Sequence, residues 1–261
     1  MISFAAITPH PPIIIPGIGQ EADLQLVANT VVAMRKLGQE LEAINPDVLV
    51  IVSPHAPLEP YSFGINRRRH LEGSFLDFGL DRSFRMDNDL QLVDHIMFAG
   101  QNNDEDVKVH AFESQLDHGA LVPLFYLTRN IQPLVVHLSF SFLSLERHFD
   151  FGEVIGKIIG QDPRSVAIVA SGDLSHRLTK HAPAGYSSRG AEFDRELISM
   201  LSNNFIRNIL GLKSTFTDEA GECGLRSIVM LLGMLKQEKY SFRLLSYEGP
   251  FGVGYLTARL L

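Results

Sequence analysis

Three short apolar runs stand out along the chain, and each one leads into a loop that contains a histidine. Residues 2–7 run into Thr8-Pro9-His10, residues 48–52 run into Ser53-Pro54-His55, and residues 166–170 run into Ser171-Gly172-Asp173-Leu174-Ser175-His176. Continuous apolar runs of this length are typical of strands buried on both faces. A proline ends such a strand because it has no backbone N–H to donate. We therefore predict three strands that present His10, His55 and His176 where ligand sites of open α/β sheets lie.

Between the strands, apolar residues recur every three or four positions and predict helices. The longest such pattern covers residues 21–44 and ends before Asn45-Pro46, since proline disfavours helix in the preceding residue. A right-handed crossover through this helix makes the first two strands parallel. Further helices are predicted at 87–98 (capped by Asp87), 120–127 (capped by Asp117), 144–160, 192–201, 204–212 and 225–235, and further strands at 107–110, 134–138, 242–247 and 252–260.

The remaining segments are polar or irregular. Residues 58–86 contain scattered aromatic residues and predict short strands or a lid; core packing is the favoured use of the aromatics over a pocket for a ring. Residues 100–106 predict a polar turn, and residues 217–224 predict a polar loop that opens into an apolar helix. No repeat or linker interrupts the alternation of strand and helix, so residues 1–261 predict a single α/β domain.

Composition narrows the class of partner. Hydrophobic residues make up 45% of the chain, which suits a buried core, and the formal net charge of −7 argues against nucleic acid or an anionic membrane surface as partner. The basic run Arg67-Arg68-Arg69 is too short to change this and is interpreted as a solvated loop. A single cysteine, Cys223, excludes an internal disulfide framework and a cysteine-rich zinc module. The sequence shows no signal peptide and no membrane-length apolar run, so we expect a cytoplasmic protein.

The histidine loops also indicate a chemistry. Two histidines and one carboxylate form the facial arrangement that holds non-haem Fe(II) with open positions for substrate and oxygen. Glu222 could supply the carboxylate, although a helix-terminal role for it is slightly favoured by the sequence. Cys223 is a second candidate, because a thiolate binds iron, zinc or copper; its other interpretation is a small buried side chain. The remaining histidines have no such context and are interpreted as surface or core residues: His70, His95, His110, His137, His148 and His181.

Four motifs together carry a family resemblance: TPHPP at His10, SPHAP at His55, LDHGALVPL at His118 and SGDLSH at His176. In this order and at these distances they resemble the class III extradiol ring-cleaving dioxygenases of the LigB type. They resemble in particular the branch related to the Memo proteins and associated with AmmeMemoRadiSam systems. The resemblance extends from His10 to Leu261. It implies an α/β fold with a central mixed, largely parallel sheet flanked by helices and one metal site at the C-terminal edge of the strands.

The resemblance also implies roles for residues. His10 and His55 would hold Fe(II), His176 would act as acid and base, and His118 would bind substrate or assist proton transfer. Typical dioxygenases of the family place a glutamate as third ligand and Memo-type relatives a cysteine, and Glu222-Cys223 offers both. If the dioxygenase pattern holds, Glu222→Gln weakens iron binding more than Cys223→Ser does. The reverse order would favour the Memo type.

Three functions follow from these residues. The first is an Fe(II)-dependent extradiol dioxygenase that acts on a catechol or aminophenol with O2. The second is a Memo-like protein that retains the pocket but serves as a binding or redox partner, with copper, with iron or with no metal. The third is a metal-dependent hydrolase, because the same donors suit zinc. The presence of both His118 and His176 favours an enzyme. The family resemblance suggests a homo-oligomer. The sequence leaves the identity of the aromatic substrate open.

Overall fold

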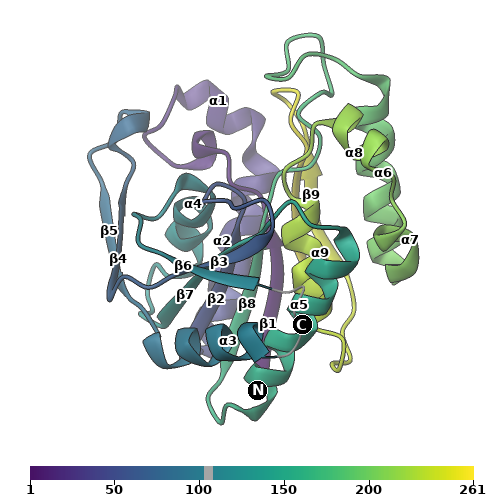
Figure 1. Ribbon diagram of the computed structural model, residues 1–261. Coiled ribbons are helices and arrows are strands. Elements are labelled where there is room, and N and C mark those ends of the chain that lie inside the picture. Colours follow the sequence, from purple (N-terminus) through teal and green to yellow (C-terminus); the bar gives the residue numbers. More distant parts are fainter. Residues whose placement is uncertain (103–107) are drawn as a thin grey trace.

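The computed structural model describes residues 1–102 and 108–261 and shows one α/β domain (Figure 1). Within these residues, eight strands form a mixed sheet and two more form a separate hairpin. The strands are β1 (Ile2–Thr8), β2 (Val48–Ser53), β3 (Ser62–Asn66), β4 (His70–Ser74), β5 (Ser83–Asp87), β6 (Lys108–Phe112), β7 (Leu134–Ser139), β8 (Val166–Ser171), β9 (Arg243–Glu248) and β10 (Tyr255–Arg259). The helices are α1 (Glu21–Leu26), α2 (Ala28–Ile44), α3 (Leu90–Asn102), α4 (His118–Leu127), α5 (Leu145–Gln161), α6 (Ser188–Ser202), α7 (Ile206–Leu210), α8 (Ser214–Ala220) and α9 (Leu225–Met234), with 3₁₀ turns η1 (Pro12–Ile14) and η2 (Leu76–Phe78).

The order of strands in the sheet explains why the histidine loops meet. The order is β6-β3-β7-β2-β8-β1-β10-β9, so β8 lies between β2 and β1. β7, β2, β8 and β1 are parallel, whereas β10 and β9 form an antiparallel hairpin beside β1. The C-terminal ends of β1, β2 and β8 therefore lie next to one another at one edge. The predicted α/β fold with a mixed, largely parallel central sheet is confirmed.

Both faces of the sheet are covered, because the side chains of the central strands are apolar on both faces over most of each strand. In β2, Val50 and Val52 belong to one core while Leu49 and Ile51 belong to the other. Helices α3, α5 and α9 pack on the first face, and α2 and α4 pack on the second. Figure 1 shows the β4–β5 hairpin projecting on one side of the sheet and α6–α8 on the other.

Helices α5 and α9 approach each other unusually closely, and glycines make this approach feasible. A Cβ at Gly156 of α5 would lie 2.4 Å from the Met234 carbonyl oxygen of α9. A Cβ at Gly233 of α9 would lie 2.1 Å from the Phe149 carbonyl oxygen. Gly160, one turn further along α5, lies outside this contact, since a Cβ there would meet nothing within 4 Å. The contact fixes α9, and with it the loop that precedes α9, against the rest of the domain.

Two of the predicted helices differ from the observed ones in where they begin or break. Asp87 is the last residue of β5 and not a helix cap; α3 begins at Leu90, and the Asp89 carboxylate accepts the Leu92 N–H (3.1 Å). Either Asp suits a cap, so the sequence pattern alone could not choose between them. The helix predicted over 21–44 is interrupted at Val27, which separates α1 from α2.

The segments predicted as irregular are more ordered than expected. The polar loop over 217–224 is wrong in its first half, because α8 extends to Ala220 and ends at Gly221, whose φ of 64° suits a glycine cap. The helix predicted at 204–212 shortens to α7, and α6 begins earlier than the predicted residue 192. Residues 58–86 form β3, β4 and β5, with β3 inside the main sheet.

The polar turn predicted at 100–106 is wrong for residues 100–102, because α3 extends to Asn102; its remaining residues lie within 103–107, outside the described residues. The neighbouring strand predicted at 107–110 is β6. Across the described ranges, the chain has no helix with the length and apolar character needed to cross a membrane.

Candidate metal centre

Three potential metal donors converge at the sheet edge where β1 and β2 end. The Nε2 atoms of His10 and His55 are 3.1 Å apart, and the Cys223 Sγ lies 3.7 Å from His10 Nε2. All three donor atoms lie within 4.8 Å of one another, and among the described residues these are the three that form such a group. His10 is almost fully buried, while the His55 side chain is exposed, so the group lies at a surface that a ligand can reach.

Ser171, the last residue of β8, orients the His10 ring. Its Oγ is 2.5 Å from the Gly119 carbonyl oxygen, to which it donates, and 3.0 Å from His10 Nδ1. Because the only hydrogen of the Ser171 hydroxyl is donated to Gly119, the Ser171 oxygen can only accept a hydrogen bond from His10, and His10 therefore donates its Nδ1–H. The proton is thereby held on Nδ1, and the Nε2 lone pair is left facing His55 and Cys223. The Asp173 carboxylate in addition accepts the backbone N–H of His10 (3.0 Å).

Cys223 reaches the histidines because two loops cross with no side chain between them. A Cβ at Gly172 would lie 2.1 Å from the Gly224 Cα, a separation that requires glycine at both positions. The backbone N–H of Cys223 then donates to the Asp173 carbonyl oxygen (3.3 Å). The contact thus joins the loop after β8 to the loop before α9 and places the thiol beside His10.

His118 lies in the same cluster, at the first residue of α4. Its ring stacks on His55 with centroids 4.2 Å apart, and its centroid is 5.5 Å from that of His10. Asp117 is the N-cap, as predicted: its Oδ1 accepts the Ala120 N–H (3.3 Å) and the Ser53 hydroxyl (2.5 Å). Asp117 Oδ2 lies 3.2 Å from Nε2 of the fully buried His137. The helix start is therefore anchored to β2 and β7.

His176 lies in the loop after β8. Its Nδ1 is 3.1 Å from the Leu174 carbonyl oxygen, which only a proton donor can satisfy, so Nε2 carries the free lone pair. Burial lowers the pKa of His176, and the nearby His55 lowers it further. The imidazole is therefore neutral near pH 7 and able to accept a proton.

Glu222 has a different set of contacts. Its Oε2 accepts the Leu225 N–H (2.6 Å) at the start of α9, which is a helix-terminal role. It does not belong to the three-donor group formed by the described residues. Burial raises the pKa of the Glu222 carboxyl to about 7, against the lowering effect of the Leu225 N–H.

The electrostatics of the histidine cluster follow from burial and mutual repulsion. Burial lowers the pKa values of His10, His55 and His118, and neighbouring imidazoles lower those of His10 and His55 further. The Asp117 carboxylate opposes this for all three. Burial by itself would raise the pKa of Asp117, but the adjacent His137 side chain and the hydrogen bond from Ser53 keep it well below its usual range. Unprotonated imidazoles are the form that ligates metals.

The donor set fits a metal ion. Ligands 2.0–2.3 Å from a common ion at tetrahedral angles lie about 3.3–3.6 Å apart, close to the separations of His10 Nε2 from its two neighbours. A metal ligand must also be deprotonated, so Cys223 can bind an ion only as the thiolate. Without an ion, burial and the carboxylates of Asp173 and Glu222 raise the pKa of the Cys223 thiol. A bound cation would reverse that cost, since it deprotonates a coordinating thiol.

Sequence reasoning missed residues that support the cluster. His137 was predicted to be a surface or core residue without a role, yet it contacts Asp117 directly. Ser171 and Asp173 lie within the quoted SGDLSH motif, but the sequence assigned no role to them. Their position directly after an apolar strand was the available signal; their partners, at residues 10 and 119, were not visible in the sequence.

The fold and this donor group define an α/β protein with a candidate metal centre at the carboxyl edge of its sheet. The chain belongs to the LigB family of class III extradiol dioxygenases: the family model described as the catalytic LigB subunit of aromatic ring-opening dioxygenase matches residues 4–258.

Two curated relatives and one solved structure are similar to this chain. Protein CA_C1420 of Clostridium acetobutylicum is 29% identical over 97% of the chain, which spans 56% of the length of that relative. The 3,4-dihydroxyphenylacetate 2,3-dioxygenase of Escherichia coli is 26% identical over 83% of the chain and 84% of its own length. The crystal structure of the uncharacterized protein JW3007 from Escherichia coli K12 superposes with a TM-score of 0.69 at 16% identity, over 99% of both chains, which shows a shared fold.

Proposed function

We propose that this chain, as one LigB-like domain over residues 1–261, is a metal-dependent dioxygenase that opens the ring of a catechol or aminophenol with O2. The observation that carries the proposal is the convergence of His10, His55 and Cys223 beside His118 at the sheet edge. Membership of the LigB family and similarity to a 3,4-dihydroxyphenylacetate 2,3-dioxygenase support the substrate class.

In this proposal His10, His55 and Cys223 hold the metal, with Fe(II) as the first candidate and zinc or copper as alternatives. A bound Fe(II) ion would supply a common site for the two substrate hydroxyl oxygens and O2 and would lower the pKa of those hydroxyls. Glu222 is assigned to the start of α9, because its carboxylate is already engaged by the Leu225 N–H.

His176 and His118 handle protons in the proposal. Both imidazoles are neutral near pH 7, because burial lowers their pKa values. His176 accepts a proton from a substrate hydroxyl at Nε2 and later returns it, while Leu174 holds the other ring nitrogen. His118, whose ring stacks on His55, would hydrogen-bond the second hydroxyl.

A second function is favoured by one observation, the cysteine among the donors. A thiolate suits Cu(I), and a His/His/Cys group also matches redox sites in which no substrate is turned over. The second candidate is therefore a Memo-like metal-binding or redox protein that acts on a partner without ring cleavage.

The deciding experiment is oxygen uptake by anaerobically Fe(II)-loaded protein offered a panel of catechols and aminophenols. We expect stoichiometric uptake with a yellow ring-opened product. His176→Gln should retain the metal and lose turnover, and His181→Gln, at an exposed histidine, should behave like the wild type. Metal bound at one equivalent with no uptake across the panel would contradict the dioxygenase proposal and favour the second candidate.

A further inference from the structure

A second concave site lies away from the histidine cluster, at the other end of α4. It has a volume of about 530 Å³ and is bounded by α2, the C-terminal end of α4 and the hairpin between β4 and β5. Since α4 has 10 residues and a helix rises 1.5 Å per residue, its two ends are about 15 Å apart. The cavity is therefore separate from the candidate metal centre that begins at His118.

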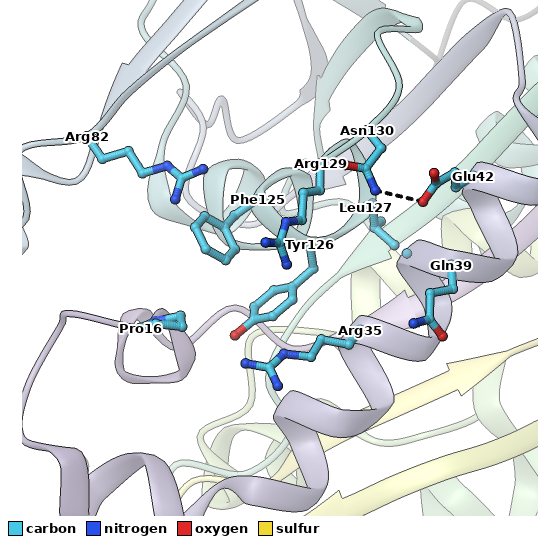
Figure 2. Close-up of a pocket in the computed structure, with 11 residues that line it drawn as sticks. Pro16, Arg35, Gln39, Glu42, Arg82, Phe125, Tyr126, Leu127, Arg129 and Asn130 are labelled. Atoms are coloured by element: carbon cyan, nitrogen blue, oxygen red, sulfur yellow. Dashed lines mark hydrogen bonds between the residues drawn. The ribbon is translucent and has the colours of Figure 1, made fainter.

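Arginines from three different elements line this cavity. Arg35 comes from α2, Arg82 from the β4–β5 hairpin, and Arg129 from the segment after α4. Figure 2 shows the three guanidinium groups turned toward the space around Phe125 and Tyr126. All three side chains are exposed, so an exchangeable ligand can reach their guanidinium groups.

The protein neutralises the positive charge of this cavity only in part. Within the described residues, neither Arg35 nor Arg129 forms an ion pair with a carboxylate, and Arg82 stacks on the Phe125 ring at 4.6 Å. The cavity contains one acidic residue, Glu42, whose carboxylate accepts the Asn130 amide (2.9 Å). The negative end of the α4 dipole compensates part of one cation. Three convergent guanidinium groups still exceed what one carboxylate and one helix end can offset.

The walls of the cavity are held rigidly. Gly38 lets α2 approach α4 directly, since a Cβ there would lie 2.3 Å from the Tyr126 carbonyl oxygen. The Tyr126 hydroxyl donates to the Ile14 carbonyl oxygen and fixes the ring between the arginines. Arg35 and Arg129 are therefore presented from a preformed frame, which reduces the entropy cost of binding.

We propose that this arginine cavity, defined by Arg35, Arg82 and Arg129, binds an organic phosphate. A guanidinium fork matches phosphate oxygens in pairs, and several forks around one space favour an anion with more than one charge over a single carboxylate. The volume lies within the range of small-molecule sites and exceeds what inorganic phosphate fills. Pro16 and Phe125 offer apolar surface, and the Gln39 and Asn130 side chains offer amide groups, to the organic part.

The test is calorimetric titration of the metal-loaded protein at low salt with pyrophosphate, ribose 5-phosphate, ADP and citrate. We expect ribose 5-phosphate or ADP to bind more tightly than citrate. The double variant Arg35→Ala/Arg129→Ala should weaken that binding by at least about tenfold, because each lost charged hydrogen bond is worth that order. Arg69→Ala, at an exposed arginine in a different basic cluster, should leave binding unchanged.

Phosphates also chelate metals, so His55→Ala serves as the second control. Retained phosphate binding in this variant supports the arginine cavity. Binding lost in His55→Ala or in Arg69→Ala but kept in the double arginine variant would overturn the proposal. Absence of binding by all three phosphates, or tighter binding of citrate than of any phosphate, would also overturn it. Because both arginines are exposed, unchanged thermal melts should show that the double variant folds.

Discussion

At the scale of single residues, the identity of the third metal ligand, Cys223 or Glu222, can be tested directly. We expect Cys223→Ser to weaken metal binding more than about a hundredfold, beyond the 10- to 100-fold typical of residues that only support ligands. Glu222→Gln should cost less, because Glu222 contacts the Leu225 N–H and an amide oxygen can replace that bond. Metal titration of both purified variants measures this. A larger loss for Glu222→Gln would instead identify Glu222 as the ligand, as in typical dioxygenases of the family. The order expected here is the one that the resemblance associates with Memo-type relatives, so oxygen uptake, and not the ligand order, decides between the two proposed functions.

The hydroxyl of Ser171 gives a second prediction at this scale. Ser171→Ala removes the acceptor for His10 Nδ1–H, so the ring loses its fixed tautomer and orientation. We expect metal affinity to fall by roughly 10- to 100-fold with little change in the fold. Ser202→Ala, which removes an exposed hydroxyl bonded to a helix carbonyl, is the matched control. Equal affinities in both variants would remove Ser171 from the site.

His148 is buried outside the site and predicts a pH dependence of stability. Burial lowers the pKa of His148 to about 4, against the raising effect of backbone hydrogen bonds at Ser144 and Ser141, so the ring is neutral near pH 7. Its Nδ1 lies 2.7 Å from the Ser144 carbonyl oxygen, and its Nε2 lies 3.3 Å from the Ser141 nitrogen and 3.1 Å from the Ser141 carbonyl oxygen. The unfolded chain takes up this proton near pH 6.5, whereas the folded chain does so only near pH 4. The contribution is present above pH 6.5 and is lost as pH falls, by about 3 kcal/mol at pH 4.

Denaturant unfolding at several pH values measures this effect. His148→Gln should be less stable than the wild type at pH 7, and the difference should shrink between pH 6.5 and 4. His181→Gln, at an exposed position, should run parallel to the wild type across that window. A constant difference for His148→Gln would show that His148 does not carry the pH dependence.

The sequence could bring candidate site residues together only where those residues directly follow a predicted strand. His10 and His55 could be paired in advance, because parallel strands end at one edge of a sheet. The choice between Glu222 and Cys223 could not be made, since it depends on the crossing of Gly172 with Gly224. That contact joins positions far apart in the chain, and the periodicity of apolar residues says nothing about it.

At the scale of elements, the close packing of α5 on α9 makes a matched pair of substitutions informative. Gly156→Ala places a methyl group against the Met234 carbonyl oxygen, so we expect destabilisation of about 1–3 kcal/mol. Gly160→Ala lies in the same helix with open space around it and should stabilise by about 0.5–1 kcal/mol. Chemical denaturation of both variants provides the comparison. Equal effects would show that the helices separate without cost.

The sequence predicted strands that are buried on both faces and helices whose apolar residues recur with the helical period. It failed where the identity of the N-cap residue determines where a helix starts. Strands β1, β2 and β8 were found from their uninterrupted apolar residues, and α4 from Asp117. The start of α3 was misplaced because Asp87 and Asp89 both suit a cap, and only the pairing of β5 with β4 assigns Asp87 to a strand. Helix α8 was missed because its short sequence is polar on its outer side and resembles a loop.

At the scale of the whole molecule, metal binding should stabilise the entire domain. His10 and His55 lie in the loops after β1 and β2, and Cys223 lies in the loop before α9, so an ion joins segments that are far apart in the chain. At a free metal concentration a hundredfold above Kd, linkage adds about 2.7 kcal/mol, or about 5 °C or more in Tm for a domain of this size. Thermal melts with and without metal measure the shift. An equal shift in His55→Ala would place the stabilising ion elsewhere.

The position of β1 has a consequence for how the protein is made. β1 is synthesised before β8 and β10, between which it lies, and the residues of those two strands follow more than 150 positions later. These partner strands do not yet exist when β1 is synthesised, so the backbone N–H and C=O groups along its edges stay unpaired and its apolar faces stay uncovered until β8 and β10 have been made. Long-range pairing of this kind slows folding. We therefore expect truncated nascent chains to depend on chaperones and to acquire no metal until residue 223 has emerged.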